Sequence, residues 1–303
     1  MKFEVTILGS SSATPIFNRN PTAQLLNSND HYYLIDCGEG TQQQLIRYGY
    51  KASKIDNIFI SHLHGDHFFG LVGLLSSLHL NGRTKELNLF GPEGLMEILE
   101  LQFKHSDTRL SYTINYKALK TDRPELIFEN KDIEVETIIL NHRIPCTGFK
   151  FKEKKRLRKL NQELLENDHI PVEYYNLLKN GVDFELPDGR KINHQLYSSD
   201  SATPRTYCYC SDTKYDESYF SSIEGADLLY HEATFMHNLS DRALETHHTT
   251  AKQAAEVARR VGAKKLLIGH FSSRYKSLDE LYAEAKFDFD STYLAIEGRT
   301  YEI

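Results

Sequence analysis

The chain alternates short apolar runs with polar loops along most of its length. Helical segments are predicted at 41–48, 68–80, 92–104 and 249–261, and two of them stop at glycines, Gly49 and Gly262. Because helices alternate with strands, the pattern predicts an α/β fold with helices packed over sheet faces. The predicted strands are 3–8, 32–36, 55–60, 87–90, 133–140, 206–210, 227–230 and 265–268.

Many of the predicted strands end in a polar loop that carries histidine or carboxylate side chains. Loops that lie at one edge of a sheet can bring such side chains into a single active site. Residues 150 to about 195 differ in character, because 150–159 carries seven cations and one anion, and a polar stretch rich in proline and glycine follows. We expect one domain over residues 1–303 with an inserted arm at 150–195.

Composition narrows the class of protein. With 303 residues and 40% hydrophobic side chains the chain can bury a sizeable core, and its net charge of −6 leaves nucleic-acid contact to a local patch. The cysteines Cys37, Cys146, Cys208 and Cys210 form no C-x-x-C pair, so we expect no disulfide framework and a cytoplasmic location. We find no apolar signal core and no run of about 18 apolar residues, so we expect neither visible secretion nor membrane insertion.

The run His62-Leu63-His64-Gly65-Asp66-His67 comes directly after a predicted strand. Zinc prefers imidazole and carboxylate ligands, three or four per site. Four such groups within six residues are too many for one zinc with an open position, so we interpret the run as part of a two-metal centre, which suits hydrolysis of a phosphate ester. A surface histidine cluster is the alternative. Taken singly, His142 and His270 fit a core or surface histidine better than a ligand, and Asp212 fits a turn or helix N-cap.

Several further motifs look like those of a known family. With them the chain resembles the metallo-β-lactamase superfamily and, within it, the ribonuclease Z family of tRNA 3′-end-processing endonucleases. The histidine run alone marks the superfamily, whereas 231–235 and 270–275 are far more specific. The motifs are Leu8-Gly9-Ser10-Ser11 with Asn18-Arg19-Asn20, Ile35-Asp36-Cys37-Gly38-Glu39-Gly40-Thr41, Gly70-Leu71, Asn141-His142, Cys210-Ser211-Asp212-Thr213, His231-Glu232-Ala233-Thr234-Phe235 and His270-Phe271-Ser272-Ser273-Arg274-Tyr275.

The resemblance implies a four-layer αββα sandwich that forms a homodimer, two zinc ions per chain and precursor tRNA as the substrate. One zinc would be held by His62, His64 and His142, the other by Asp66, His67 and His270, with Asp212 bridging the two. The family's His-Ser-Thr loop matches His247-His248-Thr249, which gives His247 the place of the catalytic histidine.

The chain departs from the family at two places. Phe17 stands where the family's Pro-x-Lys-x-Arg-Asn element has lysine, and that element helps to set the cleavage position. In the arm, the family's Gly-Pro-rich motif is reduced to His169-Ile170-Pro171-Val172-Glu173.

The mechanism expected from these residues is zinc-dependent cleavage of the 3′ trailer. Asp66 would orient the attacking water and accept its proton, and His247, oriented by Glu232, would protonate the leaving 3′-oxygen. The products would be tRNA with a 3′-hydroxyl and a trailer with a 5′-phosphate. The basic stretch 150–159 is either the root of an arm that clamps tRNA or a solvated helix face.

Two other functions fit parts of the pattern. A metallo-β-lactamase-fold hydrolase of small phosphodiesters, lactams or thioesters would use the same ligands. A relative without metal, acting as an RNA-binding or scaffolding protein, would have lost ligands, whereas all seven positions are filled here.

Overall fold

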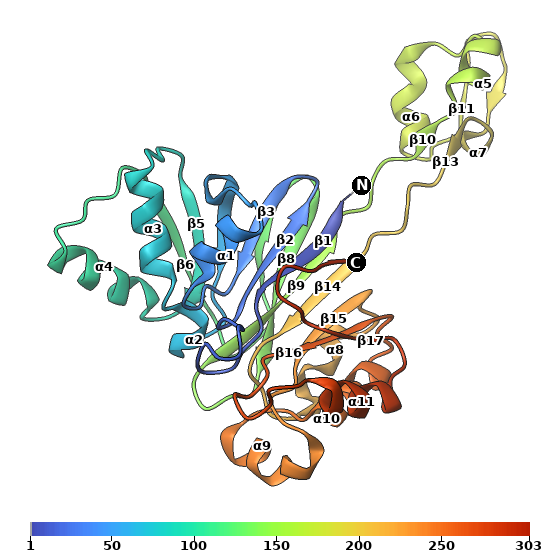
Figure 1. Ribbon diagram of the computed structural model, residues 1–303. Coiled ribbons are helices and arrows are strands. Elements are labelled where there is room, and N and C mark those ends of the chain that lie inside the picture. The colour runs from blue at the N-terminus through green and yellow to red at the C-terminus, as the bar shows by residue number, and fades with distance from the viewer. Residues whose placement is uncertain (1) are drawn as a thin grey trace. The chain divides into compact units, whose positions relative to one another are not determined.

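The computed structural model describes residues 2–303, which form two compact units. The larger unit contains residues 2–152 and Arg205–Ile303, and the smaller one is Glu153–Pro204. The larger unit carries the histidine run and is built on two sheets (Figure 1). Within residues 2–303, every helix is too short or too polar to span a lipid bilayer.

Each large sheet has seven strands within the described residues. The first contains, in spatial order, β18 (Thr300–Glu302), β1 (Phe3–Gly9), β2 (Ala23–Ser28), β3 (His31–Ile35), β4 (Ile55–Phe59), β5 (Leu87–Pro92) and β6 (Ile114–Leu119). The second contains β17 (Thr292–Leu294), β16 (Leu266–Gly269), β15 (Leu228–Glu232), β14 (Thr206–Cys210), β9 (Cys146–Glu153), β8 (Ile133–Leu140) and β7 (Leu126–Glu129).

Helices lie outside both sheets of the larger unit (Figure 1). Those associated with the first sheet are α1 (Thr41–Arg47), α2 (Gly65–Phe68), α3 (Leu71–Leu80) and α4 (Leu95–His105). Those associated with the second are α8 (Phe220–Ile223), α10 (Ala251–Arg260) and α11 (Asp279–Asp288), and α9 (Ser240–Thr246) follows β15 in the chain. Helix α10 begins with a capping box, in which Thr250 accepts from the Gln253 backbone and the Gln253 side chain accepts from the Thr250 backbone.

Apolar side chains divide into three layers between these elements. Aromatic residues of both sheets, including Phe59, Phe149 and Tyr209, pack in the central layer. Leucines of α1, α3 and α4 cover the outer face of the first sheet, and alanines of α10 cover the outer face of the second. The expected four-layer αββα sandwich is therefore confirmed.

The predicted strands and helices are present in the structure, but their bounds differ at some places and several further elements were not predicted. The helix expected at 68–80 is two helices, α2 and α3, separated at Phe69 and Gly70. A side chain at Gly70 would collide with the Gly38 carbonyl oxygen, so the chain needs glycine at this close approach. Strands β2 and β9 were missed, since both are buried and carry polar residues that do not alternate regularly. The other elements of the larger unit that were not predicted are β6, β7, β17, β18, α8, α9 and α11.

The smaller unit, Glu153–Pro204, has a core of its own. Leu165, Leu178 and Tyr197 are buried in it, and Tyr174 stacks on Phe184 with ring centroids 4.7 Å apart. Its elements are β10 (Lys159–Leu160), α5 (Gln162–Asn167), α6 (Tyr175–Lys179), β11 (Phe184–Glu185), β12 (Lys191–Ile192), α7 (His194–Tyr197) and β13 (Ser198–Ser199).

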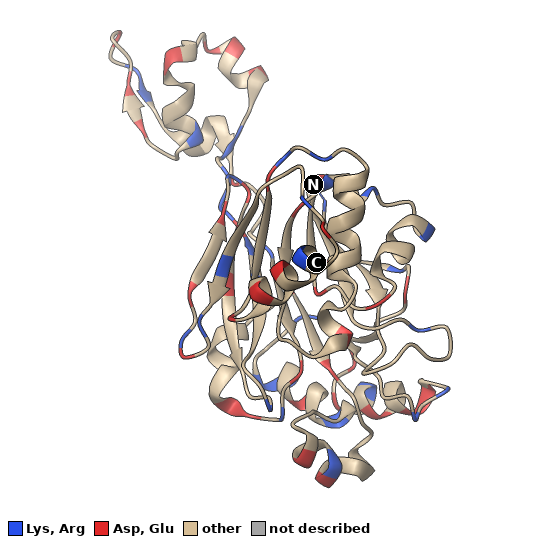
Figure 2. Cartoon of the chain, turned by 90° about the vertical axis from the view of Figure 1, so that its left-hand side faces the viewer, with Lys and Arg blue, Asp and Glu red and all other residues tan. Residues whose placement is uncertain are grey.

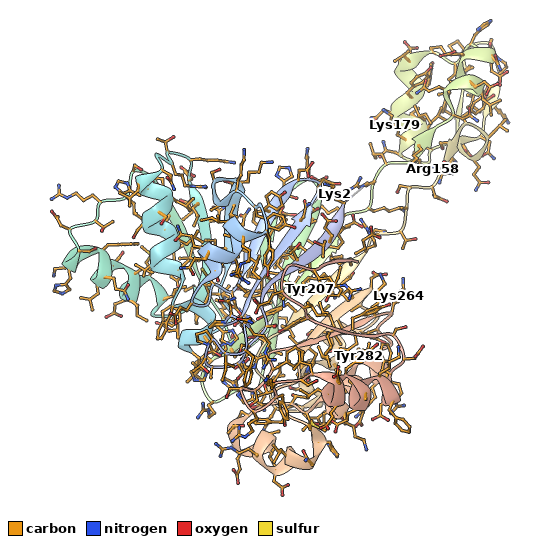
Figure 3. The ribbon with its side chains drawn as sticks, in the orientation of Figure 1. Lys2, Arg158, Lys179, Tyr207, Lys264 and Tyr282 are labelled. Carbon is orange, nitrogen blue, oxygen red and sulfur yellow. The ribbon has the colours of Figure 1, made fainter. Side chains whose placement is uncertain are left out.

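The basic stretch 150–159 is not a helix face. It runs along the end of β9, through an irregular segment and into β10. Arg158 and Lys179 lie at the same end of the smaller unit, where the Arg158 N–H donates to the Lys179 carbonyl oxygen over 2.9 Å (Figure 3). Acidic residues and the two cations Arg190 and Lys191 are spread over the rest of this unit (Figure 2).

Candidate metal centre

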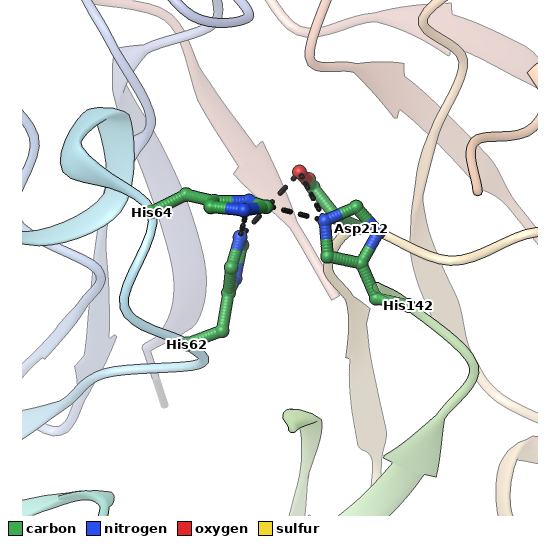
Figure 4. Close-up of side chains that lie close together, drawn as sticks. All are labelled: His62, His64, His142 and Asp212. Atoms are coloured by element: carbon green, nitrogen blue, oxygen red, sulfur yellow. Dashed lines mark hydrogen bonds and ion pairs between the residues drawn. The ribbon is translucent and has the colours of Figure 1, made fainter. Parts of the chain in front are cut away.

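Three histidines converge beyond the ends of β4 and β8. His62 and His64 lie in the loop that joins β4 to α2, and His142 follows β8. His62 Nε2 and His142 Nε2 each lie 3.1 Å from His64 Nδ1 (Figure 4). The structure thus brings together the three residues predicted for the first metal.

A second group lies beside it. His270 Nε2, in the loop after β16, is 3.3 Å from both Asp66 Oδ2 and His67 Nε2. Asp66 and His67 belong to the single turn of α2, which keeps them next to the first group. These are the three residues predicted for the second metal.

Asp212 stands between the two groups. Its Oδ2 is 3.6 Å from His62 Nε2 and 3.8 Å from His142 Nε2. Its Oδ1 is 3.4 Å from His67 Nε2 and 3.2 Å from His270 Nε2. One carboxylate oxygen therefore faces each group, as a bridging ligand requires.

The topology explains why residues so far apart in sequence meet. Strands β14, β15 and β16 pair in parallel, so their carboxyl ends lie at one edge of the second sheet. Asp212, Glu232 and His270 stand at those three ends. Such an edge is where open α/β sheets place their sites.

The outer ring nitrogens of the histidines have partners of their own. An acceptor at one nitrogen fixes the tautomer and leaves the lone pair of the other nitrogen facing the centre. The contacts are His142 Nδ1 to the His247 carbonyl oxygen (2.9 Å), His67 Nδ1 to Asp36 Oδ2 (2.8 Å) and His270 Nδ1 to Thr234 Oγ1 (2.9 Å).

This donor set fits a pair of metal ions. Ligand atoms on a tetrahedral zinc lie about 3.3 Å apart, given bonds of about 2.0–2.1 Å, and the donors here are 3.1 to 3.8 Å apart. Asp212 Oδ1 is buried and has no hydrogen-bond donor. Inward lone pairs and an unsatisfied carboxylate oxygen repel one another unless a cation lies between them.

Burial favours the neutral form of two of the histidines, His62 and His142. Burial lowers the pKa of His142 to about 4, although Asp212 opposes the shift. Burial and the neighbouring His67 lower the pKa of His62 well below its usual value. Neutral imidazole is the metal-binding form.

Asp36 was not predicted to have a role in the site, yet it supports the ligand turn. Its Oδ2 accepts from His67 Nδ1 (2.8 Å), from the Ser61 hydroxyl (2.9 Å) and from the Tyr209 hydroxyl (2.5 Å). Its Oδ1 accepts from the Ser61 backbone N–H (2.8 Å). The signal was present in the sequence, because Asp36 belongs to the motif at 35–41.

Glu232 pairs with His248. Its Oε1 lies 2.9 Å from His248 Nδ1, and it also accepts from the Thr213 backbone N–H (2.9 Å). The His248 ring stacks on that of His270 with centroids 5.4 Å apart. Burial disfavours its charged form, but the Glu232 carboxylate outweighs that effect and raises the pKa of His248 to about 9.

The site opens to solvent through a cavity of about 410 Å³. Its lining includes Asp66, Arg143, Asp212 and His248. Arg143, which follows the ligand His142, adds a cation at the rim. A cavity with acidic metal ligands below and a cation at its edge can accept a phosphodiester.

Comparison with known proteins identifies the family. Ribonuclease Z of Cytophaga hutchinsonii is 49% identical over 304 residues, covering 100% of this chain and 97% of that protein. Ribonuclease Z of Porphyromonas gingivalis is 45% identical and covers 97% of each chain. The chain belongs to the ribonuclease Z family. It also matches the family model described as "Anti-Pycsar protein Apyc1" over residues 3–289, and so is a member of the family that this model describes.

Solved structures agree with this assignment. Human tRNase Z, short form, superposes with a TM-score of 0.72 and 27% identity, covering 99% of both chains. YhfI from Bacillus subtilis, a metallo-β-lactamase fold protein, gives a TM-score of 0.70 at 22% identity over 99% of both chains, which shows the shared fold.

The structure differs from the sequence-based prediction in the histidine that Glu232 contacts. The prediction that Glu232 orients His247 is wrong, because Glu232 bonds His248 instead. His247 ends α9 in a left-handed conformation with φ of 55°, and it supplies its carbonyl oxygen to His142. The next residue after His248, Thr249, is buried and donates its hydroxyl to the Thr213 carbonyl oxygen (2.6 Å).

Proposed function

We propose that this ribonuclease Z family member is a metal-dependent endoribonuclease that removes the 3′ trailer from tRNA precursors. The observation that carries the proposal is the position of Asp212, with one carboxylate oxygen facing each of two ligand groups. The relatives named ribonuclease Z, 41% to 49% identical over nearly the whole chain, supply the substrate class.

The proposed cofactor is two zinc ions per chain. His62, His64 and His142 would hold one, Asp66, His67 and His270 the other, and Asp212 would bridge them. Bound there, the metals would lower the pKa of a water molecule and stabilise negative charge on the phosphate oxygens. Elemental analysis of the purified protein tests the count, which we expect to be two per chain.

We propose that Asp66 orients the attacking water and accepts its proton. Its Oδ2 is held by the Ala13 backbone N–H (2.7 Å), and it lies 3.3 Å from His270 Nε2. A carboxylate fixed in this way at the cavity keeps one geometry through the reaction, which reduces the reorganisation that attack on phosphorus requires.

His248 is the proposed donor of the proton that the leaving 3′-oxygen needs. It lies in the cavity, carries a proton near neutral pH and is oriented by Glu232. His247 was the residue expected from the sequence, but it does not line this cavity. The products would be tRNA with a 3′-hydroxyl and a trailer with a 5′-phosphate.

We propose that the smaller unit binds the body of tRNA through the cations at one of its ends. Lys155, Arg156, Arg158 and Lys179 line a cavity of about 840 Å³ within the unit. Cations spaced along a backbone of phosphates supply affinity without sequence preference.

Assembly and location follow the family resemblance. We propose a homodimer, which light scattering on the purified protein would detect as twice the chain mass. We place the protein in the cytoplasm, since all four cysteines are free and buried. Burial raises the pKa of Cys37 and Cys208 to about 12, so these thiols stay protonated and unreactive.

Turnover on three substrates tests the activity. The proposal expects efficient cleavage of 3′-extended pre-tRNA, slow hydrolysis of a small phosphodiester and none of a thioester. The competing function, a general hydrolase of this fold, expects the small substrates to be turned over at least as efficiently as pre-tRNA.

A further inference from the structure

One buried hydroxyl touches the outer side of both ligand groups. It belongs to Ser61, the residue before the histidine run, whose side chain is fully buried. Its Oγ lies 3.0 Å from His62 Nδ1 and 3.5 Å from His67 Nδ1. His62 is in the group predicted for the first metal and His67 in the group predicted for the second, so this hydroxyl adjoins a ligand of each.

The neighbours of Ser61 determine the direction of its hydrogen bonds. Its single O–H donates to Asp36 Oδ2 over 2.9 Å. The hydroxyl of Ser211 donates to Ser61 Oγ, also over 2.9 Å. A hydroxyl has one proton and two lone pairs, so the second lone pair is left to accept from His62 Nδ1–H. With its proton on Nδ1, His62 presents the lone pair of Nε2 to the metal centre.

Asp36 extends this network to the second ligand group. The same Oδ2 that accepts from Ser61 also accepts from His67 Nδ1 over 2.8 Å. The outer nitrogens of the two histidines therefore lead to one carboxylate, that of His67 directly and that of His62 through Ser61. By contrast, the outer nitrogens of His142 and His270 end at separate acceptors.

Burial strengthens this arrangement. Asp36, Ser61, His62 and His67 are all fully buried, so no solvent competes for their hydrogen bonds, and linked bonds polarise one another. Cys146 Sγ also lies 3.6 Å from His62 Nδ1, but sulfur is a weak acceptor, so the oxygen at 3.0 Å is the stronger partner.

We propose that Ser61 is a positioning residue that couples the two metal sites through Asp36, so that the outer contacts of His62 and His67 hold or fail together. The inference rests on the proposed function, because it takes two metal ions as the cofactor. Asp212 joins the same sites as a shared ligand, whereas Ser61 and Asp36 act through the orientation of the two imidazoles.

A double-mutant cycle tests the coupling. The quantity measured is the overall constant for binding two zinc ions, obtained by competition with a chelating indicator and without RNA. We expect Ser61→Ala to lower this constant about 10-fold and Asp36→Asn to lower it by about 10- to 100-fold. Without the carboxylate, the Ser61 hydroxyl no longer has to accept from His62. The double variant should therefore match Asp36→Asn within about twofold.

Independent contributions predict a different result. In that case the two losses multiply in the double variant. The overall constant counts each loss once, whichever site is filled first, so the sharing of Asp212 does not alter this expectation. Losses that multiply would overturn the coupling.

Two further variants separate the hydroxyl from packing. Ser61→Thr keeps the hydroxyl and should stay within about threefold of the wild type. Ser28→Ala removes another fully buried serine hydroxyl, at the end of β2 that pairs with His31, and should leave zinc binding unchanged. A loss in either variant as large as that in Ser61→Ala would assign the effect to packing and overturn the role of Ser61.

Failure of the proposed function has a separate signature. A wild type that binds two zinc ions but leaves pre-tRNA uncut would refute the proposed activity, and the coupling would still be decided by the binding constants. A wild type that binds a single ion would overturn the coupling, whatever its activity.

Discussion

The candidate metal centre and the smaller unit, Glu153–Pro204, differ in how firmly their charged and ligand side chains are held. At the metal centre the ligands are largely buried, and most outer ring nitrogens have an acceptor. In the smaller unit the charged side chains are mostly exposed, over a core of a few apolar residues. Bond making requires atoms fixed to a fraction of an ångström, whereas attraction to phosphates requires only charge at about the right place.

The largest expected effect comes from removing the bridging ligand. Asp212→Ala should lose at least one metal ion per chain and lower pre-tRNA cleavage by at least about 10³-fold, because both metal sites share this carboxylate. Elemental analysis and single-turnover kinetics measure the two losses. Asp227→Ala, at the other end of β15 and paired with Lys264, is the control. If Asp212→Ala kept its full metal content, metal binding would not depend on this carboxylate, and the contrast drawn between the metal centre and the smaller unit would fail.

The next effect tests His248, the proposed donor of the proton to the leaving oxygen. His248→Ala should lower the rate of RNA cleavage by about 10²–10⁴-fold, since the leaving oxygen loses its proton donor. His247→Ala should cost much less, because it contributes a backbone carbonyl that alanine retains. Rates are compared at saturating substrate, and the reverse ranking would return the role to His247.

A smaller effect is expected one residue away from the ligands. Asp36→Asn should weaken metal binding by about 10- to 100-fold, since the acceptor that orients His67 is lost. Competition with a chelating indicator measures the affinity. Tyr207→Phe, which removes the hydroxyl of a buried tyrosine that bonds Gln24, is the matched control. Unchanged affinity in Asp36→Asn would show that the fold alone positions His67.

The smallest effect is expected from deletion of the smaller unit. The strands that precede and follow it in the sequence pair with each other, so their ends can be joined. Lys152 of β9 and Thr206 of β14 are direct partners, so a short glycine-rich turn can join Lys152 to Arg205. The deletion should raise KM for pre-tRNA about 10-fold and leave hydrolysis of a small phosphodiester intact. Equal losses on both substrates would show that the unit supports the metal centre instead of binding RNA.

Much of the fold and part of the candidate metal centre could be predicted from the sequence. The strands that end in histidine or carboxylate loops have strong apolar runs, and the histidine run carries its chemistry within six residues. His142, His270 and Asp212 could not be assigned from their own neighbourhoods, because a lone side chain after a strand has many uses. Only the resemblance to a family, and then the convergence at one sheet edge, assigned them.

The errors arose where tertiary contacts decide the outcome. The sequence His247-His248 offers two adjacent imidazoles, and the contact of Glu232 with His248 distinguishes them only in the folded chain. The break between α2 and α3 depends on the approach of Gly70 to the Gly38 carbonyl oxygen, which no local pattern encodes. Asp36 was missed for the same reason, because the residues that it contacts, Ser61 and His67, follow it by more than twenty positions.

End mapping of a cleaved pre-tRNA tests the central claim most directly. The protein, with its metal content measured, is incubated with a 3′-extended pre-tRNA, and the ends of both products are determined. We predict a single cut at the base of the trailer that leaves a 3′-hydroxyl on the tRNA and a 5′-phosphate on the trailer. An intact pre-tRNA under conditions in which a small phosphodiester is hydrolysed would contradict the account.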